Sequence, residues 1–212
     1  MKILLLDTET TGLKNAQICQ LSYIIFDPTL KKAIGRNFYL KVDRMEAGAE
    51  KVHGLSMEKL DILSKGKRFG DIAEQFLDEA KLCDIIVAHN IKFDIERVQE
   101  EYKRLGIDTG DAFSMSKRFC TMMYYTNICK IPNPRNPNQY KFPKVEEVMT
   151  FLRIEDETVV YQAKEIFGEC QGFHDARFDI TATLKLLLEG FVNGYIRKGY
   201  FSNRLKPQEV MY

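Results

Sequence analysis

Apolar residues in the first 45 positions form short runs of strand length. Residues 3–6 are a continuous apolar run that ends in acids, which predicts a strand buried on both faces of a sheet. Residues 20–26 and 38–42 predict two further strands, the first of which ends at a turn around residues 27–29. The N-terminal part is therefore expected to be mostly sheet.

Helical spacing starts after residue 70, where Asp71 is the expected N-cap and Glu74 stands at the capping-box position. Residues 85–88 then predict a strand, and Asn90 is the expected N-cap of a helix that closes at residue 106. A last helix is expected from about residue 175 to residue 194. The apolar faces of these three helices are Ile72, Phe76 and Ala80; Ile91, Ile95, Val98, Tyr102 and Leu105; and Ile180, Leu184, Leu187, Leu188 and Phe191. This order predicts an α/β fold with a central mixed sheet.

The length and composition are those of a globular protein with one large domain or one domain with appendages. Hydrophobic residues make up 45% and charged residues 29% of the 212 positions, which excludes a disordered chain and a fibrous repeat. No apolar run approaches the roughly 20 residues of a membrane-spanning helix, and the N-terminal MKILLLD reaches an acid too soon for a signal peptide. We therefore expect a cytoplasmic protein with no membrane partner. The five cysteines are scattered and never spaced C-x-x-C, which indicates free thiols and no zinc site.

Residues 117–144 differ in composition from the rest of the chain. They contain six Lys or Arg residues, no Asp or Glu, and four of the 6 prolines, whereas the whole chain has a formal net charge of only +1. The basic residues and the interleaved aromatic residues are Lys117, Arg118, Lys130, Arg135, Lys141 and Lys144, and Phe119, Tyr124, Tyr125, Tyr140 and Phe142. We interpret the segment as a basic, partly loop-like insertion that either grips a polyanion or is a solvated surface loop.

Two acids follow the first predicted strand. Asp7 and Glu9 are two positions apart, and the strand period of two places both side chains on the same face. Burying two like charges near a sheet centre costs several kcal/mol unless a cation compensates them, so a divalent metal is one explanation. The other is a solvated strand end, because the pattern Asp-x-Glu is common.

Two further acids lie on predicted helices. Asp94 lies one turn into the helix that follows Asn90, on the edge of the apolar face; simple helix-start electrostatics is its structural alternative. Asp179 belongs to the last helix, five residues after His174. Five residues at 100° each place two helical side chains about 140° apart, so the pair can cooperate only if His174 precedes or caps the helix.

Three motifs stand in order along the chain: DTETTG at residues 7–12, AHNIKFD at residues 88–94 and HDARFD at residues 174–179. Together they resemble the DEDDh branch of the 3′–5′ exonucleases, which includes the proofreading subunit of bacterial replicative DNA polymerase. The stretch VHGLS at residues 52–56 and Cys120-Thr121-Met122 are similar to intermediate segments of that family. The resemblance covers nearly the whole chain.

The resemblance implies a ribonuclease-H-like fold, with an exonuclease domain at residues 1–194 and a C-terminal extension at residues 195–212. It also implies that Asp7, Glu9, Asp94 and Asp179 bind two divalent cations, Mg²⁺ or Mn²⁺, with Asp7 shared by both ions. His174 would be the general base, because an unperturbed histidine pKa of about 6.5 suits proton transfer near neutral pH.

The resemblance further points to residues that could contact the nucleic acid. Substrate-binding roles are expected for Thr8, Thr10, Thr11, His53 and Phe93, with the alternatives of a plain loop histidine for His53 and a core residue for Phe93. His89, beside Asn90, is expected to be structural.

The expected function is hydrolysis of single-stranded or frayed DNA 3′ ends to nucleoside 5′-monophosphates, by a stand-alone enzyme or a DNA polymerase subunit. One alternative is an RNA-trimming 3′–5′ exoribonuclease with the same five site residues, since contacts to the 2′-hydroxyl cannot be identified from the sequence. Two others are a catalytically silent nucleic-acid-binding subunit and a structural α/β protein whose acids are surface charges.

Overall fold

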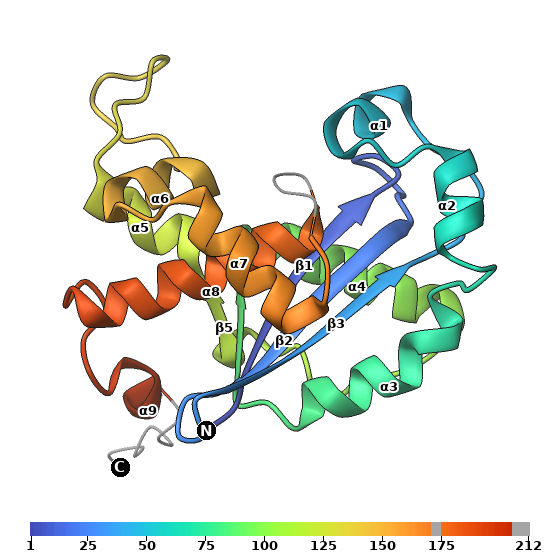
Figure 1. Cartoon of the computed structure of the whole chain (residues 1–212), viewed down its shortest axis with the longest axis horizontal. Helices are drawn as coiled ribbons and strands as arrows, with labels where there is room; N and C mark the ends of the chain where they lie inside the picture. The colour runs from blue at the N-terminus through green and yellow to red at the C-terminus, as the bar shows by residue number, and fades with distance from the viewer. Residues whose placement is uncertain (171–174, 205–212) are drawn as a thin grey trace, which may run out of the picture.

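One mixed sheet organises the part of the chain that the computed structural model describes, residues 1–170 and 175–204 (Figure 1). Its strands follow the order β3-β2-β1-β4-β5. Their bounds are β1 Ile3–Thr10, β2 Ile18–Asp27, β3 Lys32–Tyr39, β4 Ile85–Ala88 and β5 Arg118–Cys120. β1 pairs antiparallel with β2 and parallel with β4, while β4 pairs parallel with β5. The predicted α/β fold with a central mixed sheet is confirmed.

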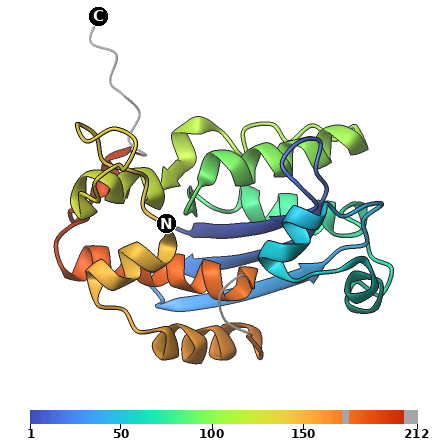
Figure 2. The same ribbon diagram turned by 90° about the horizontal axis from the view of Figure 1, so that it is seen from above.

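Helices cover both faces of this sheet (Figure 2). Their bounds are α1 Ala47–His53, α2 Met57–Leu63, α3 Gly70–Lys81, α4 Ile91–Leu105, α5 Thr121–Cys129, α6 Val145–Leu152, α7 Asp156–Phe167, α8 Ala176–Val192 and α9 Tyr200–Arg204. Leu4 and Leu6 of β1 pack with residues of α3 and α4, whereas Ile3 and Leu5 pack with α8. None of the helices in the described residues is long and apolar enough to cross a membrane.

The third strand differs from the sequence prediction. We expected residues 38–42, but β3 is Lys32–Tyr39 and shares only residues 38 and 39 with that range. The strand lies at the sheet edge and is mostly half-buried, so its sequence KAIGRNFY carries no continuous apolar run. The apolar residues Leu40 and Val42, which suggested a strand, are buried just after β3 ends.

Two predicted helix caps act differently in the structure. Asp71 lies inside α3, after the N-cap Phe69, and its Oδ2 accepts a hydrogen bond from the Arg68 N–H at 2.7 Å. Asn90 does precede α4, but its side chain makes no capping hydrogen bond. Asp175, near which we expected α8 to begin, is its N-cap, because its Oδ1 accepts from the Arg177 N–H at 3.0 Å.

The basic segment is less of an insertion than its composition indicated. Residues 118–120 are the edge strand β5 and residues 121–129 are helix α5, which bury Phe119 and Tyr125. The proline-rich part, residues 130–144, is the loop, and an isolated bridge joins Pro132 to Tyr140 within it. Ile196 and Phe201, beyond the domain boundary expected at residue 194, are buried in the same apolar cluster as Phe119.

Candidate active site

The carboxylates of Asp7 and Glu9 share the sheet face that α8 covers. They continue the alternation of Ile3 and Leu5 along β1, which extends to Thr10, so both acids lie inside the strand. Asp179 stands in the first turn of α8. One carboxylate oxygen from each of the three residues lies within 4.8 Å of the other two. The expected same-face placement of Asp7 and Glu9 is therefore confirmed.

Asp94 approaches β1 from the other face of the sheet. Its side chain is buried, and Oδ1 accepts hydrogen bonds from the Thr8 hydroxyl at 2.8 Å and from the Thr8 N–H at 3.1 Å. Asp94 is not one of the three residues whose oxygens meet within 4.8 Å. It is nevertheless close enough to act on the pKa of Asp7 as the strongest of the neighbouring charges.

Burial and mutual repulsion hold protons on this cluster. Desolvation, followed by the charges of Asp94, Asp179 and Glu9, raises the pKa of Asp7 well above its usual value. Desolvation and the charge of Asp179 raise the pKa of Glu9 to about 8. The pKa of Asp94 is raised to about 7 by burial, against which the hydrogen bonds from Thr8 work. Such shifts mark a place where negative charge gathers without a compensating cation.

The donor set of the cluster fits a divalent metal. Three carboxylates supply hard oxygen ligands, which suit Mg²⁺ or Mn²⁺ better than the softer sites that zinc prefers. A cation there would replace the protons and offset the repulsion between Asp7, Glu9 and Asp179. Asp94 is the further carboxylate within electrostatic reach.

A buried ion pair that our sequence interpretation missed lies beside the cluster. The Arg177 guanidinium is 2% exposed and donates to Asp175 through Nε at 2.9 Å and through Nη2 at 2.7 Å. Arg177 also donates to Glu169 Oε1 at 2.5 Å and to the Tyr39 hydroxyl at 3.0 Å. The charge of Asp175 adds to the upward pKa shifts of Asp7 and Glu9. The signal was present in the motif HDARFD, but sequence spacing alone does not pair its second and fourth residues.

The three histidines differ in what the structure says of them. His174, the expected general base, lies outside the described residues. His53, at the end of α1, accepts a hydrogen bond on Nδ1 from the Leu55 N–H at 3.1 Å, so Nε2 carries the proton and donates to the Thr10 carbonyl at 3.2 Å. His53 is thus placed against the residue that follows Glu9.

His89 links β4 to the end of the basic loop. Its Nε2 is 2.8 Å from the Pro143 carbonyl, which requires Nε2 to donate, and its Nδ1 is 3.0 Å from the Thr121 hydroxyl. Burial lowers the pKa of His89. These contacts agree with the structural role expected for it.

The threonines after Asp7 make internal hydrogen bonds in the protein. Thr8 binds Asp94, the Thr10 hydroxyl donates to the Gly12 carbonyl at 2.9 Å, and the Thr11 hydroxyl accepts from the Gln17 N–H at 3.0 Å. Phe93 is half-buried, and the Arg97 guanidinium lies over its ring at 5.5 Å. Their substrate-binding roles remain predictions.

Comparison with known proteins places this site in a family. A model of the exonuclease family, RNase_T, matches residues 4–187. The DNA polymerase III epsilon subunits of Buchnera aphidicola subsp. Schizaphis graminum and subsp. Acyrthosiphon pisum are each 33% identical to this chain over 112 residues. The match covers 49% of this chain and 46% of each relative, so the chain spans about half the length of these relatives. The chain belongs to the exonuclease family, and its resemblance to the DEDDh-type 3′–5′ exonucleases is confirmed.

Solved structures show the same fold at low sequence identity. A structure of exonuclease I is similar with a TM-score of 0.69 and 18% identity, over 95% of this chain and 42% of that one. E. coli exonuclease I in complex with a dT13 oligonucleotide has a TM-score of 0.67 and 19% identity, over 96% and 45%. Cell-death related nuclease 4 has a TM-score of 0.65 and 16% identity, over 91% and 64%. The expected ribonuclease-H-like fold is confirmed.

Proposed function

We propose that this protein is a metal-dependent 3′–5′ exonuclease that hydrolyses phosphodiester bonds at DNA 3′ ends and releases nucleoside 5′-monophosphates. The observation that carries the proposal is the convergence of Asp7, Glu9 and Asp179, whose carboxylate oxygens lie within 4.8 Å of one another. The chain belongs to the exonuclease family, which generally uses divalent metal ions, and this supports a metal-binding role for the cluster.

The residues divide into ligands and groups that handle protons. Asp7, Glu9 and Asp179 would hold Mg²⁺ or Mn²⁺, with Asp94 as the fourth carboxylate ligand. Two such ions, when bound, supply positive charge that stabilises the attacking and leaving oxygens of an in-line displacement at phosphorus. Thr8 fixes the orientation of the Asp94 carboxylate by its two hydrogen bonds. His174 would accept the proton of the attacking water as general base.

DNA is the proposed substrate because two kinds of relatives point to it. The curated relatives are DNA polymerase subunits, and E. coli exonuclease I has been solved in complex with a dT13 oligonucleotide. We propose single-stranded 3′ ends as the preferred form, a DNA polymerase subunit as a protein partner, and the cytoplasm as the location.

The proposal is tested with DNA and RNA oligomers labelled at either the 3′ or the 5′ end, incubated with Mg²⁺, Mn²⁺ or a chelator. We expect stepwise shortening from the 3′ end, release of nucleoside 5′-monophosphates and no activity with the chelator. Faster shortening of RNA would favour the exoribonuclease. Binding of oligomers without any cleavage would favour a catalytically silent subunit.

A further inference from the structure

Helix α4 carries a line of charged residues that begins with Asp94. Arg97, Glu101 and Arg104 follow it at three, seven and ten positions, which at 3.6 residues per turn places all four on one side of the helix. Arg97 and Glu101 are 8% and 6% exposed. Charged side chains are almost never buried without partners, so the groups that bind these side chains indicate which part of the fold they stabilise.

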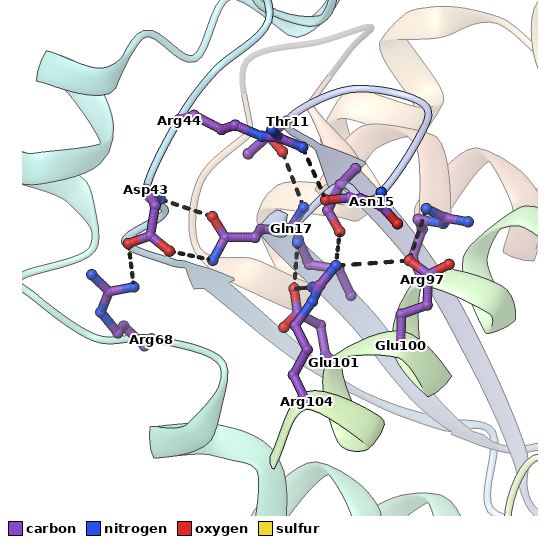
Figure 3. A network of polar contacts seen from close by, with 12 residues as sticks. Thr11, Asn15, Gln17, Asp43, Arg44, Arg68, Arg97, Glu100, Glu101 and Arg104 are labelled. Carbon is purple, nitrogen blue, oxygen red and sulfur yellow. Dashed lines mark hydrogen bonds and ion pairs between the residues drawn. The ribbon is translucent and has the colours of Figure 1, made fainter. Parts of the chain in front are cut away.

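Within the helix, Arg97 pairs with Glu100 at 2.9 Å. The other partners are main-chain groups of residues 13–18, which form the segment that leads from β1 into β2. Arg97 donates to the Leu13 carbonyl at 3.4 Å, and Arg104 donates to the Ala16 carbonyl at 2.7 Å. Glu101 Oε1 accepts from the Ile18 N–H at 2.9 Å and pairs with Arg104 at 2.8 Å. Figure 3 shows these side chains reaching from α4 to the segment.

Other side chains hold the same segment from the far side. The Gln17 amide donates to Asp43 Oδ2 at 3.0 Å and its oxygen accepts from the Asp43 N–H at 2.8 Å. Arg44 donates to the Asn15 carbonyl at 3.4 Å, as Figure 3 also shows. The segment is therefore fixed between α4 and the residues that follow β3.

Ile18 marks an irregularity in the strand pairing next to the active site. Glu9 pairs with Gln20, but Thr10 pairs with Ile18, so Cys19 is an extra residue in β2. Such a β-bulge bends its strand and re-aims the side chains beside it, and bulges are common next to active sites. The bulge turns Ile18 to the α4 face, where it joins the cluster of Leu4 and Leu6.

Glu101 accepts the N–H of the residue at this bulge, directly across the pairing from the end of β1. We propose that Glu101 is a positioning residue: by anchoring the bulge to α4, it fixes the direction in which β1 presents Glu9 to the carboxylate cluster. The same helix thereby holds both Asp94 and the strand irregularity beside Glu9. As far as it concerns turnover, this inference rests on the proposed function.

The test compares three substitutions of Glu101 with a control on the same helix. Glu101→Leu removes the acceptor, Glu101→Asp withdraws it by one methylene, and Glu101→Gln keeps an acceptor oxygen while removing the charge. Glu96→Gln is the control, because Glu96 is exposed and pairs with Lys92 at 3.9 Å, away from the segment. Mn²⁺ affinity is measured by electron paramagnetic resonance without substrate, and amide hydrogen exchange is followed for residues 10–20.

We expect Glu101→Leu to weaken Mn²⁺ binding and to lower kcat by about 10–100-fold, the usual effect of losing a supporting group behind a metal ligand. KM should stay within about twofold, and residues 10–20 should exchange faster. Glu101→Asp should show a smaller loss in the same direction, which keeps the test informative if Glu101→Leu does not fold. Glu101→Gln and Glu96→Gln should resemble the wild type.

The proposal would be overturned if Glu101→Leu and Glu101→Asp both kept the wild-type Mn²⁺ affinity and kcat and differed only in a lower melting temperature. Glu101 would then be a structural anchor only. Wild-type protein that binds Mn²⁺ but cleaves no oligomer would refute the proposed function and leave the positioning role to be judged from Mn²⁺ affinity. Wild-type protein that binds no Mn²⁺ would overturn both.

Discussion

Thr8 donates two hydrogen bonds to one oxygen of Asp94, from its hydroxyl at 2.8 Å and from its backbone N–H at 3.1 Å. Thr8 lies between Asp7 and Glu9 on β1 but faces the other side of the sheet. A carboxylate from α4 is therefore tied to the strand that presents two of the clustered acids. Both bonds favour the ionised form of Asp94 and so oppose the rise in its pKa that burial causes.

Thr8→Val should raise the pKa of Asp94, because the hydroxyl donor is lost while the backbone donor remains. The midpoint of Mn²⁺ binding against pH should then move to higher pH, since a metal must displace a more firmly held proton. Thr126→Val is the control, as its hydroxyl donates to the Met122 carbonyl within α5. An unchanged midpoint in Thr8→Val would show that Asp94 takes no part in metal binding.

Asp7→Asn should abolish nuclease activity and leave the fold intact. It removes a buried acid whose own pKa is raised by desolvation and by the charges of Asp94 and Asp179, so metal-free stability at pH 8 should hold or rise. The measurements are a cleavage assay with Mg²⁺ and a thermal melt with a chelator. Asp61→Asn, on the exposed face of α2, should change neither result. Full activity in Asp7→Asn would refute the metal assignment, and an unfolded variant would favour a structural role.

Metal-free protein should lose stability as the pH rises from about 5 to about 8. The pKa values of Glu9 and Asp94, about 8 and about 7, exceed their ordinary values, so the folded state holds protons that the unfolded chain has released. The stabilisation is fully present below the unfolded pKa values and is lost as pH rises through the folded ones. Each unit by which a folded-state pKa exceeds the unfolded-state pKa corresponds to about 1.4 kcal/mol in the free energy of unfolding. Losing that amount lowers the melting temperature by roughly 3–6 °C.

Melts in a chelator across this pH range measure the effect, with Glu9→Gln as the comparison. Glu9→Gln should flatten the decline, because its neutral side chain has no proton to release. Saturating Mg²⁺ should restore stability most at high pH. A wild-type melting temperature that is constant or rises between pH 5 and pH 8 in the chelator would contradict the clustering of these acids.

Elements whose apolar residues recur with one helix or strand spacing were predictable. β4 has the predicted bounds, 85–88, and α4 and α8 bury most of their expected stripes. The predicted stripe of α8 is only one of its buried faces, because Phe178, Ala182 and Leu186 pack in a second apolar cluster. β3 was placed wrongly since an edge strand with Gly35 at its centre carries little hydrophobic signal. The strand β5 and helix α5 were obscured by the charge of the segment that contains them, although Phe119 and Tyr125 are core residues.

The site was predictable where its residues share one element and less so where elements meet. Asp7 and Glu9 follow from strand alternation alone, whereas the approach of Asp179 needed the family resemblance. The pairing of Arg177 with Glu169 and the hold of Glu101 on Ile18 depend on tertiary packing. Such contacts join residues 8 and 83 positions apart, and no sequence period specifies them.

His174→Ala should lower turnover by about 10²–10⁴-fold, the effect typical of losing a general base. Mn²⁺ affinity should change little, because the carboxylates remain. The measurement is kcat against pH for both proteins at saturating Mg²⁺. A variant rate within a few-fold of the wild type at every pH would remove His174 from the mechanism.

The last prediction concerns the loop at residues 130–144 as a contact for the nucleic-acid strand. The structure divides the six basic residues of the segment. Three of them form ion pairs: Lys141 with Glu147 at 2.5 Å, Lys144 with Glu146 at 3.1 Å and Lys117 with Asp111 at 3.8 Å. Arg118 donates to the Phe113 carbonyl. Among the described residues, the side chains of Lys130 and Arg135 have neither an ion pair nor a hydrogen bond, and both are exposed.

These two cations are therefore the ones available to phosphates, in a protein whose candidate site repels a polyanion until metals neutralise it. Replacing Lys130 and Arg135 together with Gln should weaken binding of long oligomers and reduce the slope of log affinity against log salt by up to about 1.4, or about 0.7 per lost contact. The slope is measured in Ca²⁺, with which we expect binding without efficient cleavage. Cleavage of a dinucleotide should be nearly unchanged, because it does not reach the loop.

Replacing exposed Lys81 and Lys164 with Gln removes the same charge elsewhere and should leave the slope near its wild-type value. Equal slopes in the two double variants would mean that the loop does not contact the strand.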